Sequence, residues 1–425
     1  MSIGPAPSTL PDITTQSSQH LAWLLELTQI PTASGREHRV IRWIENWLKE
    51  RPDLHLSKDA RGNLVVSQRG NGAAAAVESG TDAPPPLFIT AHLDHPAFVV
   101  ERVVSPTILE LSFRGGVLDV FFENAPITVH PGLGRAEPLR ARLTGLAAAA
   151  SPMGKHYLAE LEIAGDQSDG PSTIRVGDVA TWELPPAEID SRGIVHTHGC
   201  DDLAAAAAAL SAYDVLRQSR CPDVHLLFTR AEEIGFIGAI AACKLGTIPQ
   251  GARVVALENS RSFPDSPIGG GPIVRVGDRM SIFTPWLTNA CAKRAEQIAN
   301  APAQPTATQT TASMAGAKKW QRKLMAGGAC EASVFCAYGY DATCLCLPLG
   351  NYHNMPYLTE LQAGGGAYDT QVLGPPRAAR EFIAVSDYLG LIELLVAIGL
   401  ELPSVDPVLE RVEKLYVDKG SVLDE

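Results

Sequence analysis

The chain has no excess of positive charge, and this shortage excludes one broad class of partners. Its 425 residues contain 35 lysines and arginines against 47 aspartates and glutamates, which gives a formal net charge of -12 at pH 7. A surface that binds nucleic acid or an anionic membrane needs a basic patch. We therefore expect no nucleic acid and no membrane among the partners of this protein.

Paired cysteine motifs and long hydrophobic runs are also missing. All eight cysteines lie at Cys200 or later and none belongs to a Cys-x-x-Cys pair, so we expect buried, reduced thiols. Residues 1–18 lack the basic stretch and apolar core of a signal peptide. The apolar run Leu389–Leu395 is interrupted by Glu393 and is too short to span a bilayer. Together these features favour a cytoplasmic location.

Two adjacent acids stand where a buried strand should end. The apolar, β-prone run Val224–Thr229 is followed closely by Glu232 and Glu233. Carboxylates rarely border a core unless something cationic offsets their desolvation. Neighbouring glutamates in such a place suggest that one binds a metal ion while the other moves a proton. The plainer alternative is a solvated turn in which Arg230 is an ion-pair partner.

Other apolar runs lead to further side chains that bind metals. His92, Glu258 and His353 each follow a stretch typical of a buried strand. Ligands in open α/β sheets bind beyond the carboxyl ends of the strands, so these residues point to one shared crevice. Asp201 and Asp202 precede an alanine-rich run, and acids are favoured at the start of a helix.

Five of these side chains form a ligand set with nitrogen and oxygen donors only. The set consists of His92, Asp201, Glu233, Glu258 and His353. Two imidazoles and three carboxylates suit Zn²⁺, Co²⁺ or Mn²⁺. They are enough for two ions if one carboxylate bridges, and Glu232 then remains free to move protons. The sequence therefore predicts a metallohydrolase.

The order of these motifs resembles that of the co-catalytic dinuclear zinc aminopeptidases. The resemblance is strongest to the glutamyl or tetrahedral aminopeptidase family, with kinship to the aminoacylase and carboxypeptidase branch, and runs from about Leu21 to His353. The motifs that carry it are His92-Leu93-Asp94, Asp201-Asp202, Glu232-Glu233-Ile234-Gly235-Phe236-Ile237-Gly238-Ala239, Glu258 and His353. It implies two divalent metal ions per subunit, with zinc favoured over cobalt or manganese.

The resemblance also implies how the ligands are shared between the two ions. Asp201 would bridge the ions. His92 and Glu258 would complete one site, and Glu233 and His353 would complete the other.

Three neighbouring acids receive supporting roles from the same resemblance. Glu232 would be the general base that takes a proton from metal-bound water and delivers it to the leaving amine. Asp94 would hold the His92 ring so that the correct nitrogen faces the metal. Asp202 would help to fix the backbone at Asp201.

Two departures from the family pattern keep a second function open. The family usually has aspartate at the position of Glu258. Its Gly-Thr-Asp segment appears here as residues 327–332, in which Glu331 is either an anchor for a substrate amine or an acid at a helix start. Besides an aminopeptidase, we therefore keep a deacylase or dipeptidase of the same clan, acting on N-acyl or small amide substrates.

Three histidines near the motifs have no firm assignment. His95 follows the first motif, and His196 and His198 lie shortly before Asp201. In an extended segment His196 and His198 share one face, where simple exposure explains both. The sequence favours this explanation over a catalytic role and leaves contact with substrate open.

The predicted fold is α/β, with a mixed central sheet flanked by helices, as in zinc exopeptidases, and an inserted small all-β barrel. Residues 1–98 and 196–425 would form a discontinuous catalytic domain, because strand–helix alternation returns after the short alternating runs of residues 99–195. In the resembled family the inserted domain mediates oligomer contacts and lines the route to the site. This resemblance implies a homo-oligomer between a dimer and a dodecamer.

Local patterns predict several elements within this frame. Residues 19–29 and 36–50 have helical apolar spacing, and Ser34 with Glu37 suggests a capping box. Residues 377–400 suggest one long helix. Residues 70–85 and 300–318 have compositions typical of mobile loops.

Overall fold

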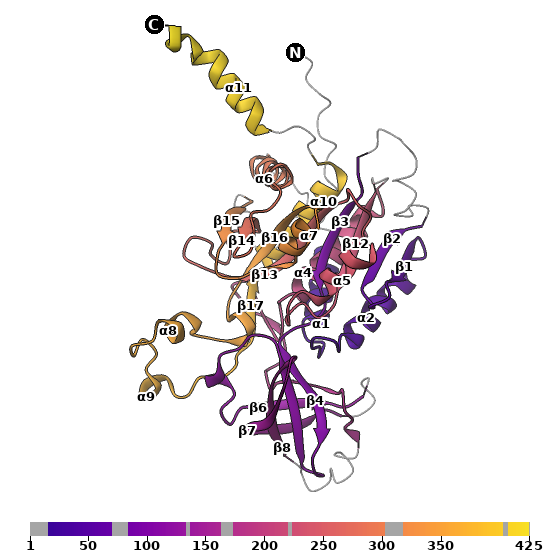
Figure 1. Cartoon of the computed structure of the whole chain (residues 1–425), viewed down its shortest axis with the longest axis vertical. Coiled ribbons are helices and arrows are strands. Elements are labelled where there is room, and N and C mark those ends of the chain that lie inside the picture. Colours follow the sequence, from indigo (N-terminus) through magenta and orange to yellow (C-terminus); the bar gives the residue numbers. More distant parts are fainter. Residues whose placement is uncertain are drawn as a thin grey trace.

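The structure is a computed structural model, and it describes residues 16–69, 84–132, 137–162, 173–219, 223–301, 318–402 and 407–424. The expected mobile loops at residues 70–85 and 300–318 fall almost wholly outside these ranges. Within them the fold has a sheet with helices on both faces and a separate barrel, which Figure 1 shows below the sheet.

The central sheet has eight strands in the order β1-β2-β12-β3-β13-β16-β14-β15. The bounds are β1 Leu54–Lys58, β2 Leu64–Gln68, β12 Val224–Thr229, β3 Leu87–His92, β13 Arg253–Arg261, β16 Asp341–Leu349, β14 Ile273–Asp278 and β15 Gln321–Met325. The four central strands β12, β3, β13 and β16 run parallel, whereas β1–β2, β2–β12 and β14–β16 pair antiparallel. Strands β3 and β12 are buried along their whole length, which explains their continuous apolar sequences.

Helices cover the two faces of this sheet unequally. One face packs against α1 Ser17–Leu27, α2 His38–Lys49, α4 Leu203–Leu216, α6 Pro285–Asn300 and α10 Val385–Leu400, and the other against α5 Ile237–Leu245 and α7 Glu331–Ala337. Every residue of α4 is buried. Its run of alanines lets the helix lie close to both the sheet and α10, because these side chains add little bulk.

The barrel is inserted into the chain between β3 and the strands that lead to α4. Its closed strand order is β4-β5-β8-β7-β6-β9, with β4 Ala97–Val103, β5 Ile108–Arg114, β6 Pro126–His130, β7 Leu139–Ser151, β8 Gly154–Leu161 and β9 Val179–Trp182. Aromatic rings fill it: the centroids of Phe122 and Tyr157 are 4.4 Å apart, and those of Phe98 and Trp182 are 5.0 Å apart. Such pairs add stability beyond their buried area.

A small third sheet connects the barrel to the body of the protein. It pairs β10 Glu188–Ile189, β11 Ile194–Thr197 and β17 Glu381–Ala384. The remaining elements are the short helices α8 Leu358–Ala363 and α9 Thr370–Leu373, the C-terminal helix α11 Pro407–Lys419, and 3-10 turns at Asp119–Phe121, Tyr352–Asn354 and Gly420–Asp424. None of the helices in the described part of the chain has the length and apolar character needed to cross a membrane.

These observations confirm the predicted fold class and correct two local predictions. The mixed sheet, its helices and the barrel are present, whereas the division at residues 98 and 196 into domains stays a prediction. Residues 377–400 do not form one helix: β17 occupies Glu381–Ala384, and α10 begins only at Val385. The capping box is wrong as well, because Glu37 precedes α2 without any side-chain cap.

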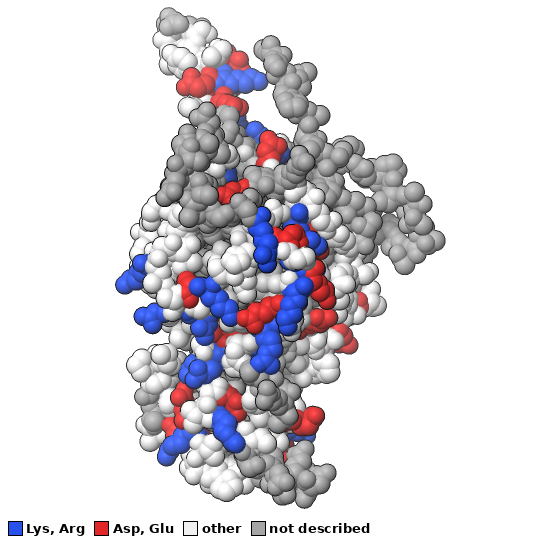
Figure 2. Space-filling model, turned by 90° about the vertical axis from the view of Figure 1, so that its right-hand side faces the viewer, with Lys and Arg blue, Asp and Glu red and all other residues white. Residues whose placement is uncertain are grey.

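The surface charges and the state of the cysteines agree with what the amino-acid composition predicts. Basic and acidic side chains are interspersed on the face shown in Figure 2, with no broad field of one sign. The seven cysteines within the described residues are free thiols, and six of them are buried.

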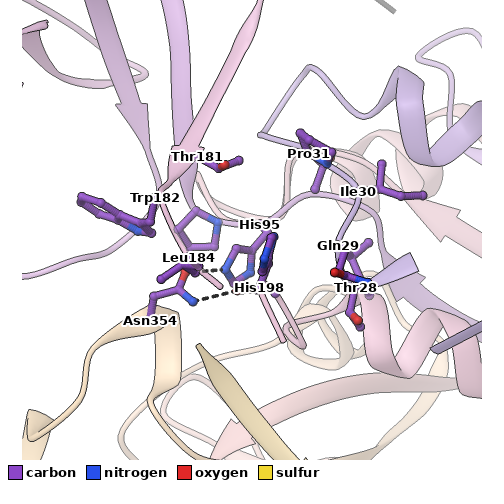
Figure 3. Close-up of a pocket in the computed structure, with 14 residues that line it drawn as sticks. Thr28, Gln29, Ile30, Pro31, His95, Thr181, Trp182, Leu184, His198 and Asn354 are labelled. Atoms are coloured by element: carbon purple, nitrogen blue, oxygen red, sulfur yellow. Dashed lines mark hydrogen bonds between the residues drawn. The ribbon is translucent and has the colours of Figure 1, made fainter. Parts of the chain in front are cut away.

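A small cavity lies where the barrel meets the helical body. It has a volume of about 30 Å³ and is lined by Thr28, Pro31, His95, Trp182 and Asn354, among others (Figure 3). Such a volume holds about two water molecules.

Candidate metal centre

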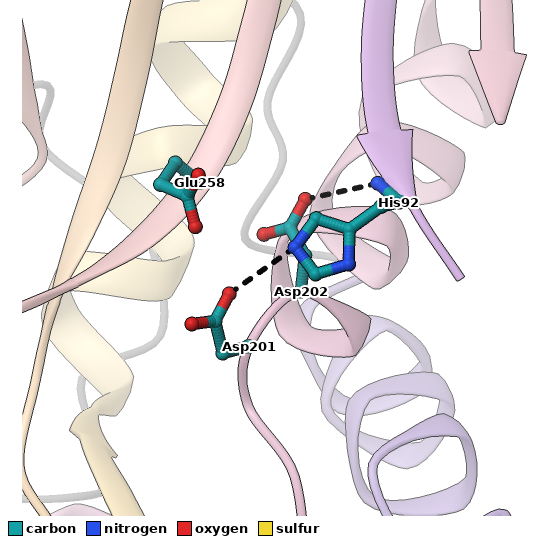
Figure 4. A group of neighbouring side chains, drawn as sticks. All are labelled: His92, Asp201, Asp202 and Glu258. Atoms are coloured by element: carbon teal, nitrogen blue, oxygen red, sulfur yellow. Dashed lines mark hydrogen bonds and ion pairs between the residues drawn. The ribbon is translucent and has the colours of Figure 1, made fainter. Parts of the chain in front are cut away.

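The side chains predicted to bind metal meet at one edge of the central sheet. Strands β12, β3, β13 and β16 are parallel neighbours, so their carboxyl ends lie at the same edge. His92 ends β3, the acid pair follows β12, and His353 follows β16 in a 3-10 turn. Asp201 joins them from the segment before α4, and Figure 4 shows its carboxylate next to His92.

Glu258 reaches this group from within a strand. The sequence suggested that the strand stops before this residue, but β13 continues to Arg261. The side chain of Glu258 is buried, and one of its oxygens lies within 4.8 Å of donor atoms of His92, Asp201 and Asp202 (Figure 4). The carboxylate of Glu258 thus reaches the cluster from within β13.

Asp201 presents one carboxylate oxygen to each histidine. Its Oδ1 lies 3.3 Å from Nε2 of His92, and its Oδ2 lies 3.4 Å from Nε2 of His353. Oε2 of Glu233 lies 3.4 Å from the same nitrogen of His353. Zinc bonds to nitrogen or oxygen of about 2.0–2.1 Å place two tetrahedral ligands about 3.3 Å apart. The observed separations therefore match pairs of ligands that share an ion.

The cluster contains more buried negative charge than a protein interior tolerates alone. Its members are the carboxylates of Asp201, Asp202, Glu232, Glu233 and Glu258 and the imidazoles of His92 and His353. Buried carboxylates are costly unless cations compensate them. Oε1 of Glu233 and Nε2 of His353 are also buried and make no hydrogen bond within the described residues. Both observations fit divalent cations bound between these donors.

Backbone carbonyls orient the two imidazole rings. Nδ1 of His92 lies 3.1 Å from the carbonyl oxygen of Asp94, and Nδ1 of His353 lies 2.7 Å from that of Gly116. A carbonyl can only accept, so each Nδ1 carries a proton, and in the neutral ring the lone pair of Nε2 points toward the cluster. Nε2 is therefore the nitrogen of each histidine that can bind a metal once its proton is lost.

Asp94 supports the acid pair more directly than it supports His92. Its carboxylate accepts hydrogen bonds from the backbone N–H groups of Glu232 at 2.9 Å and Glu233 at 3.1 Å. It also accepts one from the hydroxyl of Ser34 at 2.6 Å, whereas Nδ1 of His92 lies 3.6 Å from it. The predicted contact with His92 is thus made mainly by the Asp94 carbonyl, and the carboxylate fixes the turn after β12.

Glu37 holds the same turn from the other side. Its carboxylate accepts from the backbone N–H of Ala231 at 3.0 Å and from Nε of Arg230 at 2.7 Å. Ala231 has a φ of 54°, a left-handed conformation that costs energy outside glycine. Arg230 therefore pairs with Glu37, and not with Glu232 or Glu233 as a simple solvated turn would require.

Burial controls the protonation of the cluster in the metal-free protein. It raises the pKa of Glu233 to about 7, against the opposing charge of His353. Burial alone would lower the pKa of His353, but the charges of Glu233 and Asp201 raise it to about 9. Burial also raises the pKa values of Glu232 and Glu258 well above their ordinary range. Protons thus balance the charge that cations would otherwise balance.

The metal-free protein is expected to lose stability as the pH rises from about 4.5 to about 9. Both Glu233 and His353 have a higher pKa in the folded chain, so their contribution is present at low pH. It is lost as the pH passes through about 7 for Glu233 and about 9 for His353. The melting temperature of chelator-treated protein should fall over this range, and zinc should reduce the fall because metals bind the deprotonated ligands. A level melting temperature after chelation would contradict this expectation.

The three unassigned histidines have different environments. Nε2 of His196 lies 3.5 Å from a carboxylate oxygen of Asp190, and Nε2 of His198 lies 2.9 Å from a backbone carbonyl of Pro185. Neither belongs to the cluster. His95 does contact it, because its Nδ1 lies 2.5 Å from the carbonyl oxygen of Asp201. This contact was missed because no spacing in the sequence relates the two residues.

Glu331 lies close to the cluster without joining it. It is the first residue of α7 and is buried, and its Oε1 makes no hydrogen bond within the described part of the chain. Burial raises its pKa to about 7, although the charge of His92 opposes the shift. A buried carboxylate with a free oxygen suits a cationic ligand, and its place at a helix start is also favourable.

Comparisons with known proteins agree with this geometry. The sequence model of a family described as M42 glutamyl aminopeptidase matches residues 72–329, which is more than half of the chain. No curated protein gives a significant match.

Several solved structures share the fold at low sequence identity. The TET1 peptidase of Pyrococcus horikoshii, described as assembling into a tetrahedron or a large octahedral shell, is 19% identical, with coverage of 90% of this chain and 100% of that chain and a TM-score of 0.63. An aminopeptidase from the archaeon Desulfurococcus kamchatkensis is 19% identical, covering 91% and 95%, with a TM-score of 0.66. A TET aminopeptidase from a marine sediment archaeon of the Thaumarchaeota is 15% identical, covering 94% and 99%, with a TM-score of 0.67.

Proposed function

The chain belongs to the M42 glutamyl aminopeptidase family, and from this premise we propose that it is a metal-dependent aminopeptidase that removes N-terminal residues from peptides. The observation that carries the proposal is the meeting of Asp201 with both His92 and His353 at 3.3 and 3.4 Å. Five carboxylates around two imidazoles need cations, and a hydrolase of this family needs metals for its chemistry.

The proposed ligand assignment follows the distances within the cluster. Asp201 would hold both ions, because one of its oxygens faces His92 and the other faces His353. His92 and Glu258 would hold one ion, and Glu233 and His353 would hold the other. Zinc is the ion we expect, because the donors are imidazole and carboxylate, and cobalt or manganese would suit the same set.

Glu232 is the proposed proton carrier of the reaction. When bound, the metal ions lower the pKa of the attacking water and polarise the carbonyl of the substrate. Glu232 accepts the proton of that water and passes it to the nitrogen that leaves. Its carboxylate lies 3.9 Å from Nε2 of His92, farther than Asp201 at 3.3 Å, and its backbone is fixed by Asp94. This placement leaves the carboxylate free to exchange a proton.

A substrate panel separates this function from a deacylase or dipeptidase. The alternative stays open because Glu258 and the segment around Glu331 depart from the family pattern. If Glu331 receives a substrate amine, the metal-loaded protein should cleave aminoacyl-anilides and fail on N-acyl amino acids, because acylation removes the positive charge. Preference for the N-acyl compounds would contradict the aminopeptidase proposal and favour the deacylase.

We also propose that the chain functions as a homo-oligomer, between a dimer and a dodecamer. The support is the structural likeness to a peptidase described as assembling into a tetrahedron or a large octahedral shell, which covers 90% of this chain and 100% of that one. Light scattering during size-exclusion chromatography gives the molar mass of the assembly and therefore its number of subunits.

A further inference from the structure

Glu381 lies on β17, a strand that contacts both the segment leading to Asp201 and the segment leading to His353. Strand β17 pairs with β11, which leads to Asp201, and Glu381 lies opposite Thr197 in that pairing. On its other side β17 meets the end of β16, where Phe382 and Gly350 exchange hydrogen bonds of 2.9 and 3.2 Å. The segment after Gly350 carries His353. Glu381 therefore stands between two ligand segments that are far apart in the sequence.

The carboxylate of Glu381 binds the backbone of both segments. Its Oε2 accepts from the N–H of Cys200 at 2.5 Å and from the N–H of Asp201 at 3.2 Å. Its Oε1 accepts from the N–H of His353 at 2.8 Å. The side chain is fully buried, so these charge-assisted bonds are protected from competition with water.

The backbone at His353 needs such support. His353 has a φ of 54°, and its neighbours Asn351 and Asn354 have φ values of 53° and 62°. Residues other than glycine adopt this left-handed conformation only when their surroundings hold them there. The His353 N–H donates to Glu381 and the ring donates to the carbonyl of Gly116, and both contacts help to hold the residue.

We propose that Glu381 is a positioning residue that holds Asp201 and His353 in register for the metal ions. The inference rests on the proposed function, because it concerns the same site. Without this carboxylate, the two segments lose their common partner, and the ions would have to order them on binding. Loss of an outer partner of this kind lowers metal affinity by about 10- to 100-fold.

The test is zinc binding by the full-length, metal-free protein. Glu381→Gln keeps the size of the side chain but leaves one acceptor oxygen for three N–H donors. Its affinity for zinc, measured by competition with a chromophoric chelator, should fall by about 10- to 100-fold. Glu381→Asp keeps the charge but is one methylene shorter, so it should also lose affinity because it cannot span both segments.

Asp387 offers a matched control on the neighbouring helix. It is also fully buried and accepts from two backbone N–H groups, those of Gly269 at 2.7 Å and Gly271 at 2.8 Å. These glycines belong to the loop between β13 and β14, away from the ligand segments. Asp387→Asn should therefore lower the melting temperature and leave zinc affinity unchanged.

Two further readouts separate positioning from general destabilisation. The first is the difference in melting temperature of each variant with and without zinc. This difference should be smaller than in the unaltered protein for Glu381→Gln and unchanged for Asp387→Asn. Peptidase activity of Glu381→Gln should recover at high zinc concentration, because the variant retains all ligands and Glu232. If Glu381→Gln or Glu381→Asp binds zinc with wild-type affinity, the inference about Glu381 is wrong and the proposed function still stands. Absence of zinc binding by the unaltered chain would overturn the proposed function with it.

Discussion

Glu232→Gln is expected to lower turnover by about 100- to 10,000-fold while the protein keeps its metal ions. The amide has almost the same shape as the carboxylate but cannot accept a proton from water. Metal binding should persist, because Oε2 of Glu232 is 3.9 Å from Nε2 of His92, whereas Asp201 and Glu233 lie 3.3–3.4 Å from the histidine nitrogens that they face. Single-turnover rates on an aminoacyl-anilide and metal content by elemental analysis measure the two effects separately.

The adjacent residue provides the control for this variant. Glu233→Gln changes the same functional group one position along the chain, but its carboxylate lies 3.4 Å from Nε2 of His353. It should therefore lose metal, and excess metal should restore part of its activity. The account is contradicted if Glu232→Gln turns over normally, or if it loses metal as Glu233→Gln does.

Asp201→Asn is expected to remove most of the bound metal and nearly all activity. Asp201 is the residue whose two oxygens face both histidines, so the substitution weakens both proposed sites together. An amide offers one weaker oxygen donor and carries no charge to balance the cations. Metal content should drop from about two ions per chain to well below one, and added zinc should not restore turnover.

Asp214 is a suitable control for the loss of a buried aspartate. Its carboxylate pairs with Arg51 at 2.6 Å and with Arg217 at 2.8 Å, outside the cluster. Asp214→Asn should reduce stability, because it leaves buried charge uncompensated, and it should keep the full metal content. Equal metal loss in both variants would mean that Asp201 acts through general stability and not as a ligand.

The strands and most ligand positions could be predicted because they depend on local sequence. A strand buried on both faces has a continuous apolar run, and a polar residue at its end is easily recognised, as at His92 and Glu233. Parallel neighbours then bring such ends together without further information. Glu258 is a less clear case, because it lies within its strand, which continues to Arg261.

The supporting residues could not be predicted because their partners are distant in the sequence. Ser34 and Glu37 have the spacing of a capping box, but Ser34 bonds to Asp94 and Glu37 to the Ala231 turn. Glu381 was hidden in a stretch whose apolar spacing suggests a helix, and only the pairing of β17 with β11 reveals its place. Long-range hydrogen bonds have no signature in local periodicity.

The central claim is that two divalent cations bind on either side of the Asp201 carboxylate. Anomalous scattering from crystals of the zinc-loaded protein, recorded on both sides of the zinc edge, tests it most directly. We predict two peaks, one between Asp201 and His92 and the other between Asp201 and His353. A map without peaks at these places, or with zinc only elsewhere on the molecule, would contradict the account.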